Sequence, residues 1–260
     1  MKFSKKSLGQ NFLIDKNIIR KIVDLDKVEG KHVIEIGPGK GALTDQILKK
    51  KPKTLLIIEK DFELEKNLKE KYKTLKFVKT FNEDILKFDI EKICNKNSII
   101  FGNLPYNISS QILVKIIKFK KWPPKFNSLI FMFQKELGNK IVSRFPSKNY
   151  GRLSILSNYR LKVLKKFNIT ANCFFPKPKV SSMIIHFKPK LNTFKIKQLS
   201  SLELITNILF SNKRKMINKN IKKILNYRKI ISVTKLDMSL RPSEIKPEIY
   251  YKITELFEKN

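Results

Sequence analysis

A glycine-rich turn between a short apolar strand and a helix is the feature that most restricts the fold of this chain. Residues 32–36 (HVIEI) are typical of a buried strand, residues 37–41 (GPGKG) form the turn, and residues 42–48 (ALTDQIL) have helical spacing. Glycines allow a tight turn and a close approach of the backbone to a ligand near a helix N-terminus. The segment therefore predicts a βα unit with a ligand-binding turn.

Strands and helices alternate through the rest of the N-terminal part. The pattern predicts further strands over 54–58, 76–79, 98–101 and 128–133, and helices over 61–72, 110–119 and 135–144. This alternation favours a parallel, doubly wound sheet of the α/β class. Residues 161–167 and 182–187 indicate two more strands, which could form a hairpin at one edge of the sheet.

A boundary is expected near Pro189, after which short helices or turns are predicted at 200–210, 213–225, 232–236 and 243–257. We therefore expect a large α/β domain over 1–189 and a small helical domain over 190–260.

The charge of the chain points to a polyanionic partner. Lys and Arg number 56 against 22 Asp and Glu, which gives a net charge of +34. Such a field favours nucleic acid, and no basic amphipathic segment with a clean apolar face suggests a membrane surface. An AT-rich coding sequence, which favours lysine, is an alternative source of part of this excess.

Several other classes of protein do not fit the sequence. There is no apolar run of roughly 18 to 20 residues and no signal-peptide core, so a cytoplasmic protein without a membrane partner is expected. The two cysteines and the two histidines are isolated from one another, so neither a metal site nor a disulfide framework is predicted.

The residues around the glycine turn predict a cofactor site. Gly37 and Gly39 fit the GxGxG turn of methyltransferases, although Ala42 also completes the GxGxxA form of the dinucleotide fingerprint. Glu59, at the end of the second strand, could accept hydrogen bonds from two ribose hydroxyls in either cofactor class. Asp84, after the third strand, could accept a hydrogen bond from a cofactor adenine amino group, which favours S-adenosylmethionine. The alternative for Asp84 is an N-cap of the following turn.

Residues 102–109 (GNLPYNIS) predict the reaction site, because they follow the fourth strand, at the sheet edge where ligands bind. An aromatic amine is a poor nucleophile, since its lone pair is delocalised into the ring. Two acceptors on its N–H groups would free that lone pair for methyl transfer. Asn103 could supply a side-chain carbonyl, the Leu104–Pro105 turn a backbone carbonyl, and Tyr106 a ring that stacks on the purine. Such catalysis needs positioning and electrostatics but no strong base.

These motifs resemble the ribosomal RNA adenine dimethyltransferase family over nearly the whole chain. Residues 7–13 (SLGQNFL), 132–136 (MFQKE), 150–154 (YGRLS) and 174–180 (FFPKPKV) match further family signatures. The resemblance implies a Rossmann-like class I methyltransferase sheet with a small α-helical C-terminal domain that binds RNA, and S-adenosyl-L-methionine as cofactor. It also implies cofactor contacts from Asn11 and Leu13, and stacking of Phe174 on a flipped target base opposite Tyr106.

The C-terminal part bears on the substrate, because antibiotic-resistance relatives that methylate large-subunit RNA share the catalytic motifs. Phe210, residues 213–215 (KRK) and residues 241–242 (RP) resemble the small-subunit branch. The resemblance then implies two methyl groups on each of two adjacent adenines near the 3′ end of small-subunit (16S) ribosomal RNA, within a ribosomal assembly intermediate. We expect a monomer. A non-catalytic nucleic-acid-binding factor, a DNA adenine methyltransferase and a nicotinamide enzyme are the alternatives.

Overall fold

The computed structural model describes residues 11–259, so residues 7–10 of the predicted N-terminal motif lie outside the described residues. The chain divides into two compact units. The first contains the chain up to Gly138 together with Lys162–Pro189, and the second contains Asn139–Leu161 together with the chain from Lys190 onward. Besides the boundary expected after Pro189, the chain thus passes between the units after residues 138 and 161. Residues 139–161 group with the C-terminal residues because helix α7 (Arg152–Arg160) packs on helix α8 (Leu199–Phe210).

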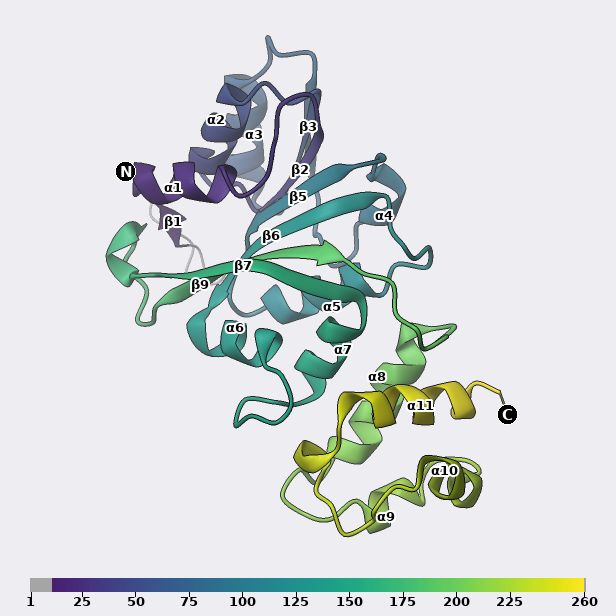
Figure 1. Cartoon of the computed structure of the whole chain (residues 1–260). Coiled ribbons are helices and arrows are strands. Elements are labelled where there is room, and N and C mark those ends of the chain that lie inside the picture. Colours follow the sequence, from purple (N-terminus) through teal and green to yellow (C-terminus); the bar gives the residue numbers. More distant parts are fainter. Residues whose placement is uncertain (1–10, 260) are drawn as a thin grey trace. The chain divides into compact units, whose positions relative to one another are not determined.

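A seven-stranded sheet forms the centre of the first unit, in the order β4-β3-β2-β5-β6-β9-β7 (Figure 1). Strands β2 to β6 are parallel to one another, and β9 is antiparallel to its neighbour β6. The strand bounds are β2 (His32–Ile36), β3 (Thr54–Glu59), β4 (Val78–Asn82), β5 (Ser98–Asn103), β6 (Phe126–Gln134), β7 (Leu161–Ile169) and β9 (Ser182–Pro189). The predicted α/β sheet is confirmed, and the two late strands lie next to each other at one edge.

Alternating strand residues face opposite sides of the sheet, and both sides are buried. On one face Val33, Leu55 and Phe101 belong to a core that the first three helices cover. Residues that face the other side of the sheet, such as Ile34 and Ile100, are also buried. Such all-apolar strands are typical of a parallel sheet covered on both faces. The helices of this unit are α1 (Lys16–Val23), α2 (Ala42–Lys49), α3 (Phe62–Lys71), α4 (Ile90–Ile93), α5 (Ser109–Ile117) and the start of α6 (Lys135–Val142).

A two-residue ladder joins the start of the described chain to a segment 160 residues later. Strand β1 (Phe12–Leu13) pairs antiparallel with β8 (Phe174–Phe175), which follows the 3-10 turn η2 (Ala171–Cys173). Helix α1 begins directly after β1, where the Asp15 side chain accepts hydrogen bonds from the backbone N–H groups of Asn17 and Ile18 at 2.9 and 3.0 Å. The ladder therefore fixes β1 and the start of α1 against the β7–β9 connection.

The second unit is helical. Besides α7 and α8 it contains α9 (Asn218–Ile221), α10 (Tyr227–Thr234), η3 (Pro242–Glu244) and α11 (Pro247–Phe257). Buried tyrosines connect its two chain segments: the Tyr150 hydroxyl donates to the Ile245 carbonyl, and the Tyr251 hydroxyl donates to the Ile155 carbonyl, both at 3.1 Å. Of the helix expected over 213–225, only α9 forms.

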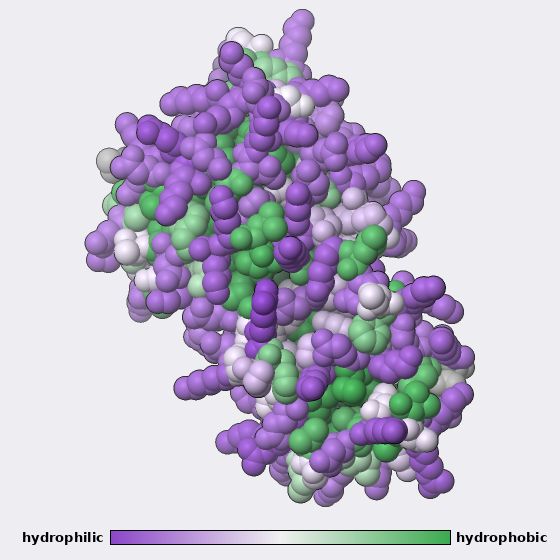
Figure 2. Space-filling model, in the orientation of Figure 1, coloured by the Kyte–Doolittle hydropathy of each residue, from purple (hydrophilic) through white to green (hydrophobic). Residues whose placement is uncertain are grey.

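Hydrophilic side chains cover much of the face seen in Figure 2, with apolar groups between them. Within residues 11–259, no helix is long and apolar enough to cross a membrane. The same residues contain no group of three or more His, Cys, Asp or Glu side chains arranged to hold a metal ion.

Candidate active site

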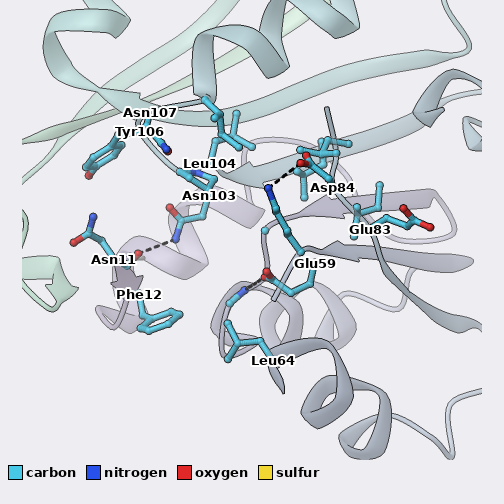
Figure 3. Close-up of a pocket in the computed structure, with 18 residues that line it drawn as sticks. Asn11, Phe12, Glu59, Leu64, Glu83, Asp84, Asn103, Leu104, Tyr106 and Asn107 are labelled. Carbon is cyan, nitrogen blue, oxygen red and sulfur yellow. Dashed lines mark hydrogen bonds and ion pairs between the residues drawn. The ribbon is translucent and has the colours of Figure 1, made fainter. Parts of the chain in front are cut away.

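A pocket lies at the carboxyl ends of β2, β3, β4 and β5, the edge at which parallel α/β sheets bind ligands (Figure 3). The space between its lining atoms amounts to about 980 Å³, including open solvent at its mouth. The lining residues are Asn11, Phe12, Ile36, Gly37, Gly39, Ile58, Glu59, Lys60, Leu64, Glu83, Asp84, Ile85 and Asn103–Ile108. The predicted cofactor and reaction motifs therefore share one pocket.

The glycine turn forms the floor of this pocket. Gly37 and Gly39 have φ values of +67° and +60°, in the left-handed region that residues with a side chain rarely adopt. A Cβ on Gly39 would lie 2.8 Å from the Phe12 ring, and one on Gly37 would lie 3.4 Å from the Asn103 backbone oxygen. The two glycines thus let the turn approach both β1 and the end of β5.

Glu59 lies beside this turn, at the end of β3. Its side chain accepts hydrogen bonds from the backbone N–H groups of Gly39 at 3.2 Å and Asp61 at 2.9 Å. The residue is only 8% exposed, and this burial raises the pKa of its carboxyl above the usual value, while the two backbone donors act in the opposite direction. Glu59 is therefore a fixed acceptor at the wall of the pocket.

Asp84 lies across the pocket from the glycine turn and has partners of its own. Its side chain accepts the Leu86 backbone N–H at 2.9 Å, which is the turn-capping contact considered as the alternative to ligand binding. The Lys60 ammonium reaches its other oxygen at 2.8 Å. This ammonium and the Leu86 N–H hold the pKa of Asp84 below its usual value. Lys60 is a pocket residue that the sequence analysis did not single out.

Asn103 ends β5, and its amide group is oriented by the residue that precedes β1. Its Nδ2 donates to the Asn11 backbone oxygen at 3.4 Å, so its Oδ1 is the atom left to accept a hydrogen bond from a ligand (Figure 3). Of the two following carbonyls, that of Pro105 accepts the Ile108 N–H in a turn, whereas that of Leu104 receives no hydrogen bond from a described group. The Asn103 side chain and the Leu104 carbonyl are therefore the two groups that we expect to act as acceptors.

Tyr106 is held by a residue that the motif analysis missed. Its hydroxyl lies 2.6 Å from the hydroxyl of Ser182, the first residue of β9. Ser182 is completely buried, and burial also raises the pKa of the Tyr106 hydroxyl. The only sequence signal for this contact is the position of Ser182 just after the residues that match the family's FxPxPxV loop.

Two predicted site residues do not line the pocket. Leu13 and Phe174 pair with each other across the β1–β8 ladder, and both side chains belong to the buried core of the first unit. Their strand neighbours alternate to the other side, so that Phe12 lines the pocket and Phe175 is 58% exposed. A cofactor contact by Leu13 and base stacking by Phe174 stay predictions.

Comparisons with known proteins agree with this geometry. A family described as ribosomal RNA adenine dimethylase matches residues 1–259. The chain belongs to this family. A relative from Pelagibacter ubique, named ribosomal RNA small subunit methyltransferase A, is 46% identical over 256 residues, which cover 98% of this chain and 97% of the relative.

Solved structures support the same fold for this dimethylase. A dimethyladenosine transferase from Plasmodium falciparum superposes with a TM-score of 0.75 and 25% identity, over 95% of this chain and 98% of that one. The 23S rRNA methyltransferase ErmE superposes with a TM-score of 0.69 and 20% identity, over 95% of this chain and all of that one, which shows the shared fold. The sheet is thus a Rossmann-like class I methyltransferase sheet.

S-adenosylmethionine is the cofactor of the dimethylase, and the pocket residues fit it. A buried carboxylate at the end of β3 suits the two hydroxyls of a ribose, and the glycine turn leaves room for a ligand next to the backbone. When bound, S-adenosylmethionine supplies an electrophilic methyl group on a cationic sulfur. Gly37, Gly39, Glu59 and Asp84 are the residues that we expect to hold it.

Proposed function

We propose that this chain methylates N6 of two adjacent adenines near the 3′ end of small-subunit (16S) ribosomal RNA, giving N6,N6-dimethyladenosine during ribosome assembly. The observation that carries this proposal is the pair of acceptors at the end of β5, next to the pocket for the cofactor. The names of the relative from Pelagibacter ubique and of the Plasmodium falciparum transferase support the substrate and the product.

The acceptors determine how the amine reacts. Asn103 Oδ1 and the Leu104 carbonyl oxygen accept the two N–H groups, which directs the nitrogen lone pair toward the methyl group. Tyr106, held by Ser182, offers its ring to the face of the purine. As the nitrogen–methyl bond forms, the methyl–sulfur bond would break with its electron pair staying on sulfur. The amine then carries a surplus proton, which can pass to solvent because the pocket is open on one side. After the first transfer, one acceptor still orients the remaining N–H.

No histidine occurs among the described residues that line this pocket. The proposed step does not need one, since the acceptors are fixed in advance and the substrate amine is neutral. The target adenine must leave its stack to reach Asn103, at a cost of a few kcal/mol that is least for an unpaired base.

The partner, the domain roles and the location are part of the same proposal. The substrate is an assembly intermediate of the small subunit, recognised by shape and by phosphate contacts. In this proposal residues 1–189 carry the methyltransferase activity, the helical residues 190–260 bind RNA, and the enzyme acts as a cytoplasmic monomer. The positive net charge of the chain supports an RNA partner.

Methyl transfer from labelled S-adenosylmethionine tests the function directly. Unmethylated small subunits, large subunits and duplex DNA serve as parallel substrates, with nucleoside analysis of each product. We expect dimethyladenosine in small-subunit RNA alone. Label in the large subunit would assign the chain to the resistance branch, and the absence of label from every substrate would favour a non-catalytic binding factor.

A further inference from the structure

The order of the strands fixes the side from which RNA reaches the pocket. The residues expected to hold the cofactor follow β2, β3 and β4, which form one end of the sheet. The acceptors for the target amine follow β5, and the Ser182 that holds Tyr106 belongs to β9. A cofactor held by those residues would occupy the β4 side, which leaves the β6-β9-β7 side for the RNA.

An exposed apolar surface lies on that side, next to the pocket. Ile14, which follows β1, is 55% exposed, and Phe175, which pairs with Phe12 of the pocket wall, is 58% exposed. Val180, between β8 and β9, is 44% exposed. Exposed aromatic and aliphatic groups are suitable surfaces for unstacked bases and sugars.

A basic groove lies between α1 and the edge strand β7, and we call it the α1–β7 groove. Helix α1 starts two residues after Ile14 and leads away from the β1–β8 ladder, while β7 runs toward that ladder (Figure 1). The lining residues of the groove are Asn17, Arg20, Lys21, Asp24, Leu25, Leu164, Lys165, Lys166 and Phe167.

The cations of the groove are available to a ligand. Arg20, Lys165 and Lys166 are exposed, and no carboxylate of the described residues forms an ion pair with any of them. Asp24, the acidic residue of the lining, is bound by Lys50 at 2.6 Å. The Lys21 ammonium lies 4.3 Å from the centre of the Phe167 ring, a cation–π contact between the two sides of the groove.

Other roles explain only part of this arrangement. Lysines on an edge strand discourage pairing between sheets, and cations in the last turn of a helix favour its dipole. Neither role requires cations on α1 and β7 to face the same groove. We propose that the α1–β7 groove binds the phosphate backbone of the RNA strand that flanks the target adenines. This inference rests on the proposed function, whose RNA substrate it localises.

Removal of three charges tests the groove. The variant R20Q/K165Q/K166Q is compared with K69Q/K76Q/K79Q, which removes the same charge from exposed lysines that line a groove at the β4 edge. We expect the first variant to raise KM for small subunits about tenfold or more and to leave kcat and the Kd of S-adenosylmethionine unchanged. Because the salt slope for single strands is about −0.7 per neutralised phosphate, the slope should become shallower by about 2.

Direct binding separates this inference from the proposed function. Fluorescence anisotropy with a labelled single-stranded RNA measures the affinity of the protein for RNA, even if the wild-type protein transfers no methyl group to small subunits. In that assay too, R20Q/K165Q/K166Q (the groove variant) should lose RNA affinity and salt dependence. K69Q/K76Q/K79Q (the β4-edge variant) should keep most of both. Equal losses in the two variants, or none in the groove variant, would overturn the proposal. So would a loss of binding to vesicles of anionic lipid with RNA binding unchanged.

Discussion

Glutamine in place of Glu35 should stabilise the cofactor-free protein by an amount that grows with pH. Glu35 lies in β2, one residue before the end of that strand, and is 1% exposed. One of its carboxylate oxygens accepts the Thr44 hydroxyl at 2.7 Å, while the other is buried without a hydrogen-bond donor. Burial raises the pKa of this carboxyl to about 8 from the ordinary 4.5, and the nearby carboxylates of Asp45 and Glu59 act in the same direction.

The sign and size of the effect follow from proton linkage. The folded protein holds this proton more tightly than the unfolded chain, so the stability that the proton provides is present below pH 4.5 and is lost as the pH rises through 8. At about 1.4 kcal/mol per pH unit, the loss reaches on the order of 4 to 5 kcal/mol above pH 8 and about 3 kcal/mol at pH 7. Glutamine has a similar shape and does not titrate, so Glu35→Gln should avoid this loss.

Urea denaturation of both proteins at pH 5, 7 and 8.5 measures the difference in unfolding free energy. We expect it to be small at pH 5 and to increase at each step. Glu70→Gln, on the exposed face of α3, controls for the chemical change itself and should alter stability by less than about 0.5 kcal/mol. A difference between the Glu35 variant and the parent that stays constant from pH 5 to 8.5 would refute the reasoning.

Three further variants test the site. Asn103→Ala removes a preorganised acceptor, so it should lower the single-turnover rate by about 10²- to 10³-fold and leave the calorimetric Kd of S-adenosylmethionine within a few-fold. A near-normal rate would contradict the role of Asn103 as an acceptor for the target amine. Glu59→Ala should weaken S-adenosylmethionine by about 10- to 100-fold, the scale of a charge-assisted hydrogen bond, and an unchanged Kd would exclude the ribose contact. Ser182→Ala should raise KM for RNA more than it lowers kcat, and it should have little further effect on KM in a Tyr106→Phe background, where the hydrogen bond between the two side chains is already absent. Equal effects of Ser182→Ala in both backgrounds would show that this hydrogen bond does not cause the change in KM.

Local sequence patterns were sufficient for the sheet and for most of the pocket. Residues 32–36 form a strand with the predicted bounds, because a short apolar run followed by glycines has few other solutions. Glu59, Asp84 and Asn103 could be placed together because the carboxyl ends of parallel strands share one edge.

Contacts between distant segments could not be predicted in this way. The β1–β8 ladder pairs residues about 160 positions apart, and no local pattern shows which of two neighbouring residues will face the pocket. Leu13 and Phe174, which the family resemblance singles out, belong to the core, while their neighbours Phe12 and Phe175 line the pocket and face solvent, respectively. Helix α1 was also missed, although Asp15 before an apolar helical repeat is a recognisable start signal.

The cofactor and reaction motifs depend on each other more than their separation in sequence suggests. The Gly37 Cα lies against the Asn103 backbone, and the Asn103 amide is oriented by the Asn11 carbonyl, whose neighbour Phe12 packs over Gly39. The glycine turn and the end of β5 therefore depend on each other for their positions in the pocket. An enzyme that moves a methyl group over a few ångströms benefits from such an arrangement, because a small displacement of either wall separates the reacting atoms. We therefore expect Gly37 and Gly39 to serve the acceptor geometry at the end of β5 as well as cofactor binding.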